Sequence, residues 1–255
     1  MSSTGQTYFI TGGNRGIGFE LVHQFAELND KNIVIATTRS PARSEELVEL
    51  AKKFTNIHVI DLDVGDEKSI DTIDDQLEKI GIKGIDTFIS NAGISTSLAP
   101  TLETTSAIYL NHYNINTLGP ILVFQKIYKY LLAKETRKAI FVSSIAGSLT
   151  NFLPLHTTAY GQSKASLNFS LIQLAKELES EKFIVIPVHP GAVATDMADA
   201  AIAHIKEVNP EFYEAVKDSM LTPEKSAEGL VSVIEGFTEK DNGIFYDYKG
   251  EVLSF

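Results

Sequence analysis

A tyrosine followed four positions later by a lysine could carry out acid–base chemistry, because on a helix the two side chains share one face. A phenol, with an ordinary pKa of about 10, exchanges protons slowly at neutral pH, and a neighbouring ammonium favours its phenolate. The chain has this spacing at Tyr130/Lys134, Tyr160/Lys164 and Tyr213/Lys217. Since chance also produces such pairs on solvated helix faces, the spacing alone carries little information.

The surroundings of each tyrosine separate the three pairs. Two serines, Ser143-Ser144, end an apolar run before Tyr160, and Pro190-Gly191 follows the next apolar run. Tyr130 lies late in a predicted helix with no such serine before it, and Tyr213 comes after all of these features. The context therefore distinguishes the pair at Tyr160 from the other two, which we predict to be surface pairs.

A glycine-rich turn near the start of the chain could hold a phosphate. It reads Thr11-Gly12-Gly13-Asn14-Arg15-Gly16-Ile17-Gly18 and lies between an apolar run and an amphipathic one. Glycines let the backbone approach a pyrophosphate closely, and the first turn of the following helix offers free N–H groups and the positive end of its dipole. The spacing differs from the G-x-G-x-x-G fingerprint of many dinucleotide sites, and a turn without a ligand is the alternative.

Short apolar runs alternate with longer amphipathic runs along the whole chain. The expected strands are Thr7–Ile10, Asn32–Thr38, Asn56–Leu62, Asp86–Ser90, Lys138–Ser143, Phe183–Val188 and Ile244–Tyr248. The expected helices are Gly16–Glu27, Glu45–Phe54, Lys68–Ile80, Tyr113–Lys134, Ala159–Ser180 and Pro223–Gly236. This alternation predicts an α/β fold whose parallel sheet is covered on both faces. We expect one domain over residues 1–255, with a helical insertion at about 195–222 that forms a lid over the substrate.

Composition excludes several classes of protein. The formal net charge of −11 disfavours binding to nucleic acid, because phosphate backbones are repelled. The absence of cysteine excludes a disulfide scaffold and a cysteine-ligated zinc site, and the six histidines show no metal-ligand spacing. No uncharged apolar stretch approaches the roughly 20 residues that a membrane span needs, and the first residues do not resemble a targeting signal. We expect a cytoplasmic protein with no metal, no membrane partner and no nucleic-acid partner.

The order of these motifs resembles the short-chain dehydrogenase/reductase family. The turn reads T-G-x-x-x-G-x-G, and Ser144, Tyr-x-x-x-Lys and Pro-Gly-x-x-x-Thr follow it in the family's order. Residues 34–39 and the ending at 243–253 further resemble the NADPH-dependent carbonyl reductases of the sniffer or C-factor type. The resemblance implies a Rossmann-type, doubly wound, seven-stranded parallel sheet in three αβα layers. It also implies a ketoreductase that is commonly a homodimer or a homotetramer.

The resemblance assigns four catalytic residues, Asn116, Ser144, Tyr160 and Lys164. Ser144 is preferred to Ser143 because the family's serine directly precedes x-x-Gly, although the reverse assignment stays open. Asn116 matches an asparagine that kinks a helix and holds a water which relays protons to the lysine. A plain polar helix residue is the alternative for Asn116, and the neighbouring asparagine at position 114 is expected to face solvent.

The resemblance also implies a path for the cofactor, NADP(H). Asn91 would brace the sheet, Asp63 and Val64 would contact the adenine, and Val193 and Thr195 would hold the nicotinamide carboxamide. A role in a turn or a helix N-cap is equally open for Asp63. The cofactor-binding residues expected in full are Gly12, Asn14, Arg15, Gly16, Ile17, Gly18, Arg39, Asp63, Val64, Asn91, Ala92, Gly93, Tyr160, Lys164, Pro190, Gly191, Val193 and Thr195.

The end of the second apolar run indicates which cofactor is used. NAD-specific folds place an acidic residue there, about 20 residues past the glycines, to bind the ribose 2′-hydroxyl. Here residues 36–40 contain no acid, and Arg39 together with Arg15 could clamp a 2′-phosphate. We therefore predict NADPH rather than NADH, with two merely exposed arginines as the alternative.

The expected substrate-contacting residues are apolar: Ile145, Phe152, Leu153 and Met197. No arginine occurs in 147–158 or in 195–222 to pair with an anionic substrate. The prediction is therefore a small neutral substrate, a hydrophobic or aryl ketone, aldehyde or diketone. The alternatives are a 3-oxoacyl or pteridine-type reductase, and a catalytically silent NADP(H)-binding sensor.

Overall fold

The fold is built on one seven-stranded parallel sheet. The computed structural model describes residues 5–151 and 155–255, and its strands are β1 (Thr7–Ile10), β2 (Ile33–Thr38), β3 (Ile57–Asp61), β4 (Thr87–Ser90), β5 (Lys138–Val142), β6 (Ile184–His189) and β7 (Tyr246–Asp247). Their order in the sheet is β3-β2-β1-β4-β5-β6-β7, and every described pairing is parallel. All seven predicted strands are confirmed, with small differences at their ends. The order reverses between β1 and β4, and in such sheets the ligand site lies at the carboxyl ends of the strands there.

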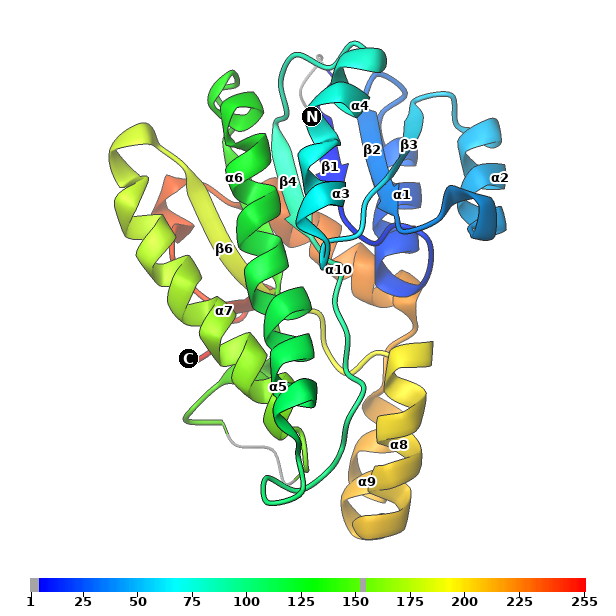
Figure 1. Ribbon diagram of the computed structural model, residues 1–255, viewed down its shortest axis with the longest axis vertical. Helices are drawn as coiled ribbons and strands as arrows, with labels where there is room; N and C mark the ends of the chain where they lie inside the picture. Colours follow the sequence, from blue (N-terminus) through cyan, green and yellow to red (C-terminus); the bar gives the residue numbers. More distant parts are fainter. Residues whose placement is uncertain (1–4, 152–154) are drawn as a thin grey trace.

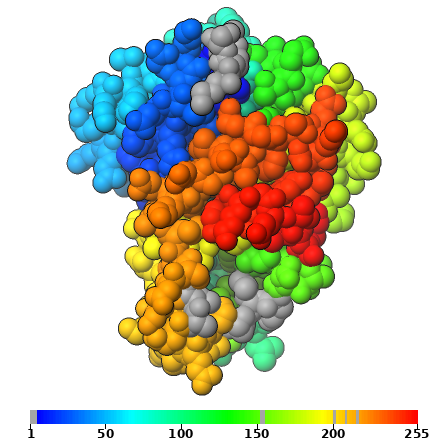
Figure 2. Space-filling view, turned by 180° about the vertical axis from the view of Figure 1, so that it is seen from behind, coloured from blue at the N-terminus to red at the C-terminus, as the bar shows by residue number. Residues whose placement is uncertain are grey.

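Helices cover both faces of the sheet and make two separate cores (Figure 1). The α-helices are α1 (Gly16–Leu28), α2 (Glu45–Lys53), α3 (Glu67–Asp71), α4 (Ile73–Lys79), α5 (Ser106–Tyr113), α6 (Gly119–Leu132), α7 (Thr158–Glu177), α8 (Asp196–Val208), α9 (Pro210–Val216) and α10 (Pro223–Gly236). One core joins α1, α2 and α10 to the sheet, and the other joins α3, α4, α6 and α7 to the opposite face. Figure 2 shows α10 and the C-terminal segment crossing the back of the molecule. The three αβα layers are therefore confirmed.

Two of the predicted helices differ in the structure. The helix expected at Tyr113–Lys134 starts earlier, with α5 at Ser106, and a π-helical turn at Asn114–Leu118 joins it to α6. Pro120 has no N–H for the carbonyl four residues before it, and the Gly119 N–H bonds the Asn114 carbonyl five residues back. The helix expected at Lys68–Ile80 is interrupted at Thr72 and divides into α3 and α4.

The insertion at 195–222 is helical, as predicted, and consists mainly of α8 and α9. In Figure 1 the two helices extend beyond one end of the sheet, on the side where the loop leading to α7 also lies. The base of the insertion is closed by backbone bonds from Leu221 N–H to Ala192 O (2.8 Å) and from Ala194 N–H to Leu221 O (2.9 Å). No described helix is both long enough and apolar enough to span a bilayer.

Candidate active site

The glycine turn between β1 and α1 leaves room for only hydrogen at one position. A Cβ on Gly18 would lie 2.1 Å from the Gly12 carbonyl oxygen and 2.4 Å from Asn91 Nδ2. Gly16 has a φ of +56°, a backbone conformation that favours glycine. Packing this close brings the main chain and the start of α1 to the carboxyl end of β1, which suits a pyrophosphate. The residues present therefore fit a dinucleotide cofactor.

Asn91 holds this turn against the end of β4. Its Nδ2 donates to the carbonyl oxygens of Thr11 (3.0 Å) and Gly12 (3.2 Å). In return, Thr11 Oγ1 accepts from the backbone N–H groups of Asn91 (2.9 Å) and Ala92 (3.0 Å). Four hydrogen bonds thus join the ends of the two strands at the reversal of the sheet and fix the backbone that would hold the cofactor. This is the bracing position that the resemblance implied for Asn91.

Three of the predicted catalytic residues come together where β5 ends and α7 begins. Ser144 directly follows β5 and precedes a short turn, Ile145–Gly147, where its Oγ accepts from the Ala146 N–H (3.1 Å). Tyr160 lies in the first turn of α7, and Lys164 lies one turn later with Nζ 5.9 Å from the centre of the Tyr160 ring. Because the Ala146 N–H occupies one lone pair of Ser144, the hydroxyl proton remains available to a substrate or phenolate oxygen.

Burial shifts the pKa values of Lys164 and Tyr160. Lys164 is 5% exposed, and desolvation lowers the pKa of its ammonium to about 8. Its Nζ donates to the Val142 carbonyl oxygen (2.8 Å), which fixes the ammonium behind the tyrosine. Burial raises the pKa of Tyr160, and a hydrogen bond from Ser144 opposes that rise. The serine therefore favours the phenolate that burial penalises.

The neighbouring serine is engaged elsewhere. The Ser143 hydroxyl donates to Asn168 Oδ1 (2.6 Å) in the core between β5 and α7. Ser143 is 1% exposed, so its hydroxyl has neither a free proton nor access to a substrate. The geometry favours Ser144 as the serine that faces Tyr160.

Asn116 lies in the π-helical turn, fully buried, and its side chain clamps the loop after β4. Its Oδ1 accepts from Ile94 N–H and its Nδ2 donates to Ile94 O, both at 2.8 Å. A Cβ on Gly93 would lie 3.1 Å from Asn116 Oδ1 and 3.8 Å from Lys164 Nζ, so this glycine lies between the two side chains. Asn114 was expected to face solvent, which is wrong: its Nδ2 donates to the Gly65 carbonyl oxygen (3.0 Å).

The predicted adenine-contacting residues follow β3. Asp63 makes a turn, since its Oδ1 accepts from the Gly65 N–H (2.9 Å). The N-cap of α3 is Asp66, and not Asp63. Val64 is buried, and its carbonyl oxygen would lie 2.3 Å from a Cβ on Gly119, so the segment after β3 packs closely against the start of α6.

The segment after β6 brings the predicted nicotinamide-contacting residues to the glycine turn. Pro190 O accepts from the Ser226 hydroxyl (2.7 Å), and Gly191 has a φ of +88°. Val193 is buried beside Leu221, and the Thr195 methyl carbon would be 3.4 Å from a Cβ on Gly16. The two ends of the expected cofactor site are thus adjacent.

The two arginines expected to clamp a 2′-phosphate differ in the structure. Arg39 follows β2 and is exposed. Arg15, at the start of α1, forms an ion pair with Asp196 at the start of α8 (2.9 Å). Both partners are exposed, Arg15 by 62% and Asp196 by 73% of the side chain, so the pair is a solvated contact between the turn and the insertion.

The sequence matches a known family model. Residues 6–206 match the short-chain dehydrogenase model, which covers both the glycine turn and the Tyr160 region. The chain belongs to the short-chain dehydrogenase family. An uncharacterized oxidoreductase of Saccharomyces cerevisiae is 42% identical over 247 residues, which cover 96% of this chain and 95% of the relative. One from Schizosaccharomyces pombe is 37% identical over the full length of both.

Two solved structures are similar to this one over nearly the whole chain. An NADPH-bound carbonyl reductase from chicken fatty liver superposes with a TM-score of 0.86 at 26% identity, covering 100% of this chain and 96% of the other. The carbonyl reductase Sniffer of Drosophila melanogaster superposes with a TM-score of 0.82 at 28% identity, covering 99% and 100%.

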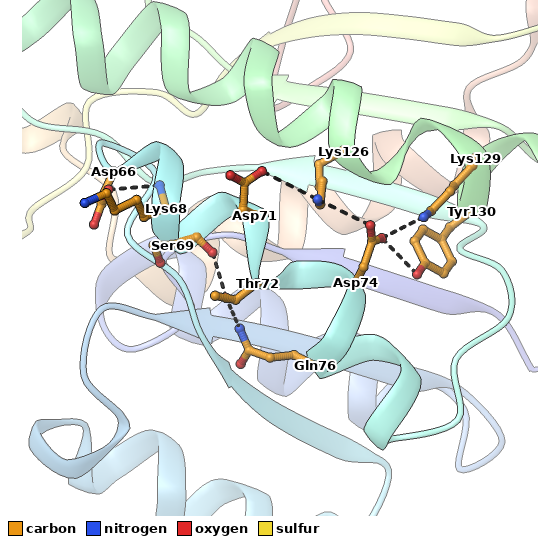
Figure 3. A network of polar contacts seen from close by, with 10 residues as sticks. All are labelled: Asp66, Lys68, Ser69, Asp71, Thr72, Asp74, Gln76, Lys126, Lys129 and Tyr130. Atoms are coloured by element: carbon orange, nitrogen blue, oxygen red, sulfur yellow. Dashed lines mark hydrogen bonds and ion pairs between the residues drawn. The ribbon is translucent and has the colours of Figure 1, made fainter.

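The other two tyrosine–lysine pairs of this short-chain dehydrogenase have structural partners. Tyr130 on α6 donates to Asp74 on α4 (3.0 Å), within the network of ion pairs shown in Figure 3. Lys134 pairs with Asp86 instead (2.9 Å). Tyr213 and Lys217 also have separate partners: Lys206 lies over the Tyr213 ring, and Lys217 pairs with Glu214.

The expected substrate contacts are only partly described. Ile145 lies directly after Ser144 and is partly buried, and Met197 lies in the first turn of α8 with 39% exposure. Phe152 and Leu153 lie outside the described residues. His189, at the end of β6, was expected to be a surface or core residue. Its Nδ1 accepts from the Ile145 N–H (3.4 Å), and burial lowers its pKa to about 4, so a neutral imidazole packs beside the turn after Ser144.

Proposed function

We propose that this short-chain dehydrogenase reduces a neutral hydrophobic or aryl ketone, aldehyde or diketone to the alcohol, with NADPH as cofactor and Tyr160 as proton donor. The observation that carries the proposal is the grouping of Ser144, Tyr160 and a buried Lys164 ammonium at the carboxyl end of β5. A polar group of this kind, beside a turn that fits a dinucleotide, is what carbonyl reduction requires.

Each side chain has a distinct task in this reaction. NADPH, when bound, supplies the hydride that adds to the carbonyl carbon. Ser144 holds the carbonyl oxygen with its free hydroxyl proton, and Tyr160 transfers its phenolic proton to that oxygen. The Lys164 ammonium, held by Val142 O, stabilises the phenolate that remains. Asn116 holds the backbone of the loop beside Lys164, and a water there could return a proton to the site.

The choice of NADPH rests on charge at the end of β2. Residues 36–40 contain no carboxylate to bind a ribose 2′-hydroxyl, and Arg39 follows the strand with an exposed side chain. Arg15 lies in the glycine turn, which is bonded to the end of β2 from the Gly13 N–H to Thr37 O (2.8 Å), and its guanidinium is paired with Asp196. The chicken carbonyl reductase, which is NADPH-bound, supports this choice by analogy.

The remaining proposals concern the protein as a whole. Residues 1–255 act as one domain, with 195–222 as a substrate lid. The protein is a cytoplasmic enzyme that acts on a small molecule, and it assembles as a homodimer or a homotetramer.

The test compares Tyr160→Phe with the same substitution at Tyr130, which is also followed four residues later by a lysine. Tyr160→Phe should lower kcat by at least about 100-fold, because general acid catalysis is lost, while NADPH affinity stays within a factor of about two. Tyr130→Phe is the matched control and should leave kcat unchanged. NADPH and NADH oxidation is followed at 340 nm with aryl ketones, α-diketones and aldehydes.

If Tyr160→Phe retains turnover, the catalytic assignment is wrong. If the wild-type protein binds NADPH yet turns over none of these carbonyl compounds, the proposed substrate class is wrong and a cofactor sensor becomes the better interpretation.

A further inference from the structure

The neighbouring strands β5 and β6 end together at the edge of the sheet where the expected site lies. Their parallel ladder continues as far as the bond from the Ser143 N–H to Val188 O (2.7 Å). The next step of the ladder would use Pro190, which has no N–H to donate. Its carbonyl oxygen accepts from the Ser226 hydroxyl (2.7 Å). The N–H of Ile145, which would meet that carbonyl in a continued ladder, donates to a side chain instead.

His189, at the end of β6, provides this acceptor. Its Nδ1 accepts from the Ile145 N–H (3.4 Å). A ring nitrogen accepts a hydrogen bond only when it carries no proton, so this contact requires the neutral imidazole with its proton on Nε2. Burial lowers the pKa of His189 to about 4, although the carboxylate of Asp247, its neighbour on β7, opposes that shift. The acceptor is therefore present at neutral pH.

The contact with His189 holds one end of the peptide group that joins Ser144 to Ile145. At the other end of this group, Ser144 O accepts from the Gly147 N–H (2.9 Å). The Ser144 hydroxyl oxygen in turn accepts from the Ala146 N–H (3.1 Å). Gly147 and Ala146 belong to the same turn as Ser144, whereas His189 belongs to a different strand. Because the peptide group is attached directly to the Ser144 Cα, its orientation determines where the serine hydroxyl points.

His189 also directly precedes the segment expected to contact the nicotinamide. The backbone of this segment has a fixed path, since Pro190 O is bonded to Ser226 and Gly191 adopts a φ of +88°. A Cβ on Gly191 would lie 2.7 Å from the Leu221 side chain, so the segment is closely packed. One imidazole thus links the serine expected to hold the substrate carbonyl with the backbone expected to hold the hydride donor.

We propose that His189 is a positioning residue, which fixes Ser144 relative to residues 190–195 and so sets the distance between the substrate carbonyl and the nicotinamide. This inference rests on the proposed function. His189 acts through the peptide group of Ile145, and it exchanges no proton with the substrate. Displacement of the carbonyl should slow hydride transfer more than it weakens binding, because reacting atoms must lie within about 3–3.5 Å of each other.

The experiment compares two amide substitutions that place their carbonyl oxygen differently. His189→Asn offers an oxygen near the position of Nδ1, where it can accept from the Ile145 N–H, whereas His189→Gln offers one near the position of Nε2. His189→Leu offers no acceptor. We expect kcat to fall by about 10- to 100-fold in His189→Leu and His189→Gln and to stay within about threefold of the wild type in His189→Asn. NADPH affinity and KM for the ketone should stay within about twofold in all three variants.

The protonation state of His189 can be measured without any turnover. In ¹⁵N NMR spectra of protein labelled at histidine, Nδ1 of His189 should carry no proton and Nε2 should carry one from about pH 5.5 to 8. The signals of His189 are identified by their loss in His189→Asn. A proton on Nδ1 in this range would overturn the inference, because the ring could not then accept from Ile145.

A substitution on β7 provides the control for stability. Tyr246→Phe removes a hydrogen bond to Asp241 (2.8 Å) near the same edge of the sheet, so it should lower the thermal unfolding temperature without changing kcat. An equal fall of kcat in this control, equal activity of His189→Gln and His189→Asn, or full kcat in His189→Leu would each overturn the positioning role and leave the reductase intact. If the wild-type protein turns over no carbonyl compound, the proposed function fails, and this inference fails with it.

Discussion

The two ends of the expected site are built in opposite ways. At the cofactor end, four hydrogen bonds join the glycine turn to Asn91 and Ala92 after β4, and Gly18 has no room for even one added carbon. At the substrate end, two backbone hydrogen bonds of Leu221 close the base of the insertion that contains α8 and α9. A solvent-exposed ion pair between Arg15 and Asp196 joins this insertion to the glycine turn. A closely packed, hydrogen-bonded cofactor site suits a single dinucleotide. An insertion with few contacts to the rest of the protein can change its position for different substrates.

The largest expected effect comes from disturbing the rigid end. Gly18→Ala places a Cβ 2.1 Å from Gly12 O, and the turn must move to accept it. Overpacking of this kind costs about 1–3 kcal/mol or more, and the displaced atoms are those that would hold the pyrophosphate. We expect NADPH affinity, measured by the fluorescence of the bound cofactor, to fall by at least about 10- to 100-fold.

A glycine at the end of α10 provides the control. Among the described residues, apart from its chain neighbours and its own helix backbone, no atom lies within 4 Å of a Cβ built on Gly236, so Gly236→Ala should bind NADPH as the wild type does. Its thermal stability should be unchanged or slightly higher, since alanine favours a helix over glycine. Equal NADPH affinity in the two alanine variants would contradict a rigid cofactor end.

The sequence predicted the rigid end better than the insertion, for a physical reason. Most strands are short runs of β-branched and aromatic residues buried on both faces, such as β1 with all four residues buried, and they can be predicted from local composition. The group around Tyr160 was predicted because the order of its motifs along the chain resembles that of the short-chain dehydrogenase family. In a parallel sheet the carboxyl ends of the strands lie at one edge, which is why these motifs come together.

What the sequence did not predict depends on distant contacts. The start of α5 carries little amphipathic pattern, and the π-helical turn depends on Pro120 and on the bonds from Asn116 to Ile94. The partner of Arg15 is 181 positions away on a helix whose placement no local pattern indicates. Such pairings arise from tertiary packing, which spacing rules do not describe.

The protonation of Lys164 should determine how the reaction depends on pH. Burial lowers the pKa of Lys164 to about 8, so its ammonium is present at neutral pH and is lost as pH rises through that value. For carbonyl reduction, kcat/KM for NADPH reports groups of the free enzyme, and it should fall about tenfold per pH unit above 8. Tyr160 titrates higher, because burial raises its pKa, so the lysine accounts for this limb.

Lys164→Arg distinguishes the lysine from other groups. A guanidinium keeps its charge throughout this range, so the variant, although slower, should show a flat profile from pH 7 to about 9.5. A wild-type profile with no decline above pH 8, or a variant with the same decline, would show that Lys164 does not control the reaction in this way.

The smallest expected effect comes from the ion pair between Arg15 and Asp196, which joins the glycine turn to the insertion. Asp196→Asn removes the charge that holds Arg15 and frees the guanidinium for a 2′-phosphate. An exposed ion pair contributes only about 0–1 kcal/mol, so NADPH affinity should rise by about two- to fivefold at low salt, while NADH affinity stays the same. Asp199→Asn, an exposed carboxylate on the same helix, is the control and should change neither. The gain should vanish at high salt, because screening weakens both the ion pair and the phosphate contact. An equal gain for NADH would mean instead that Asp196 restrains the insertion as a whole, with no competition for Arg15.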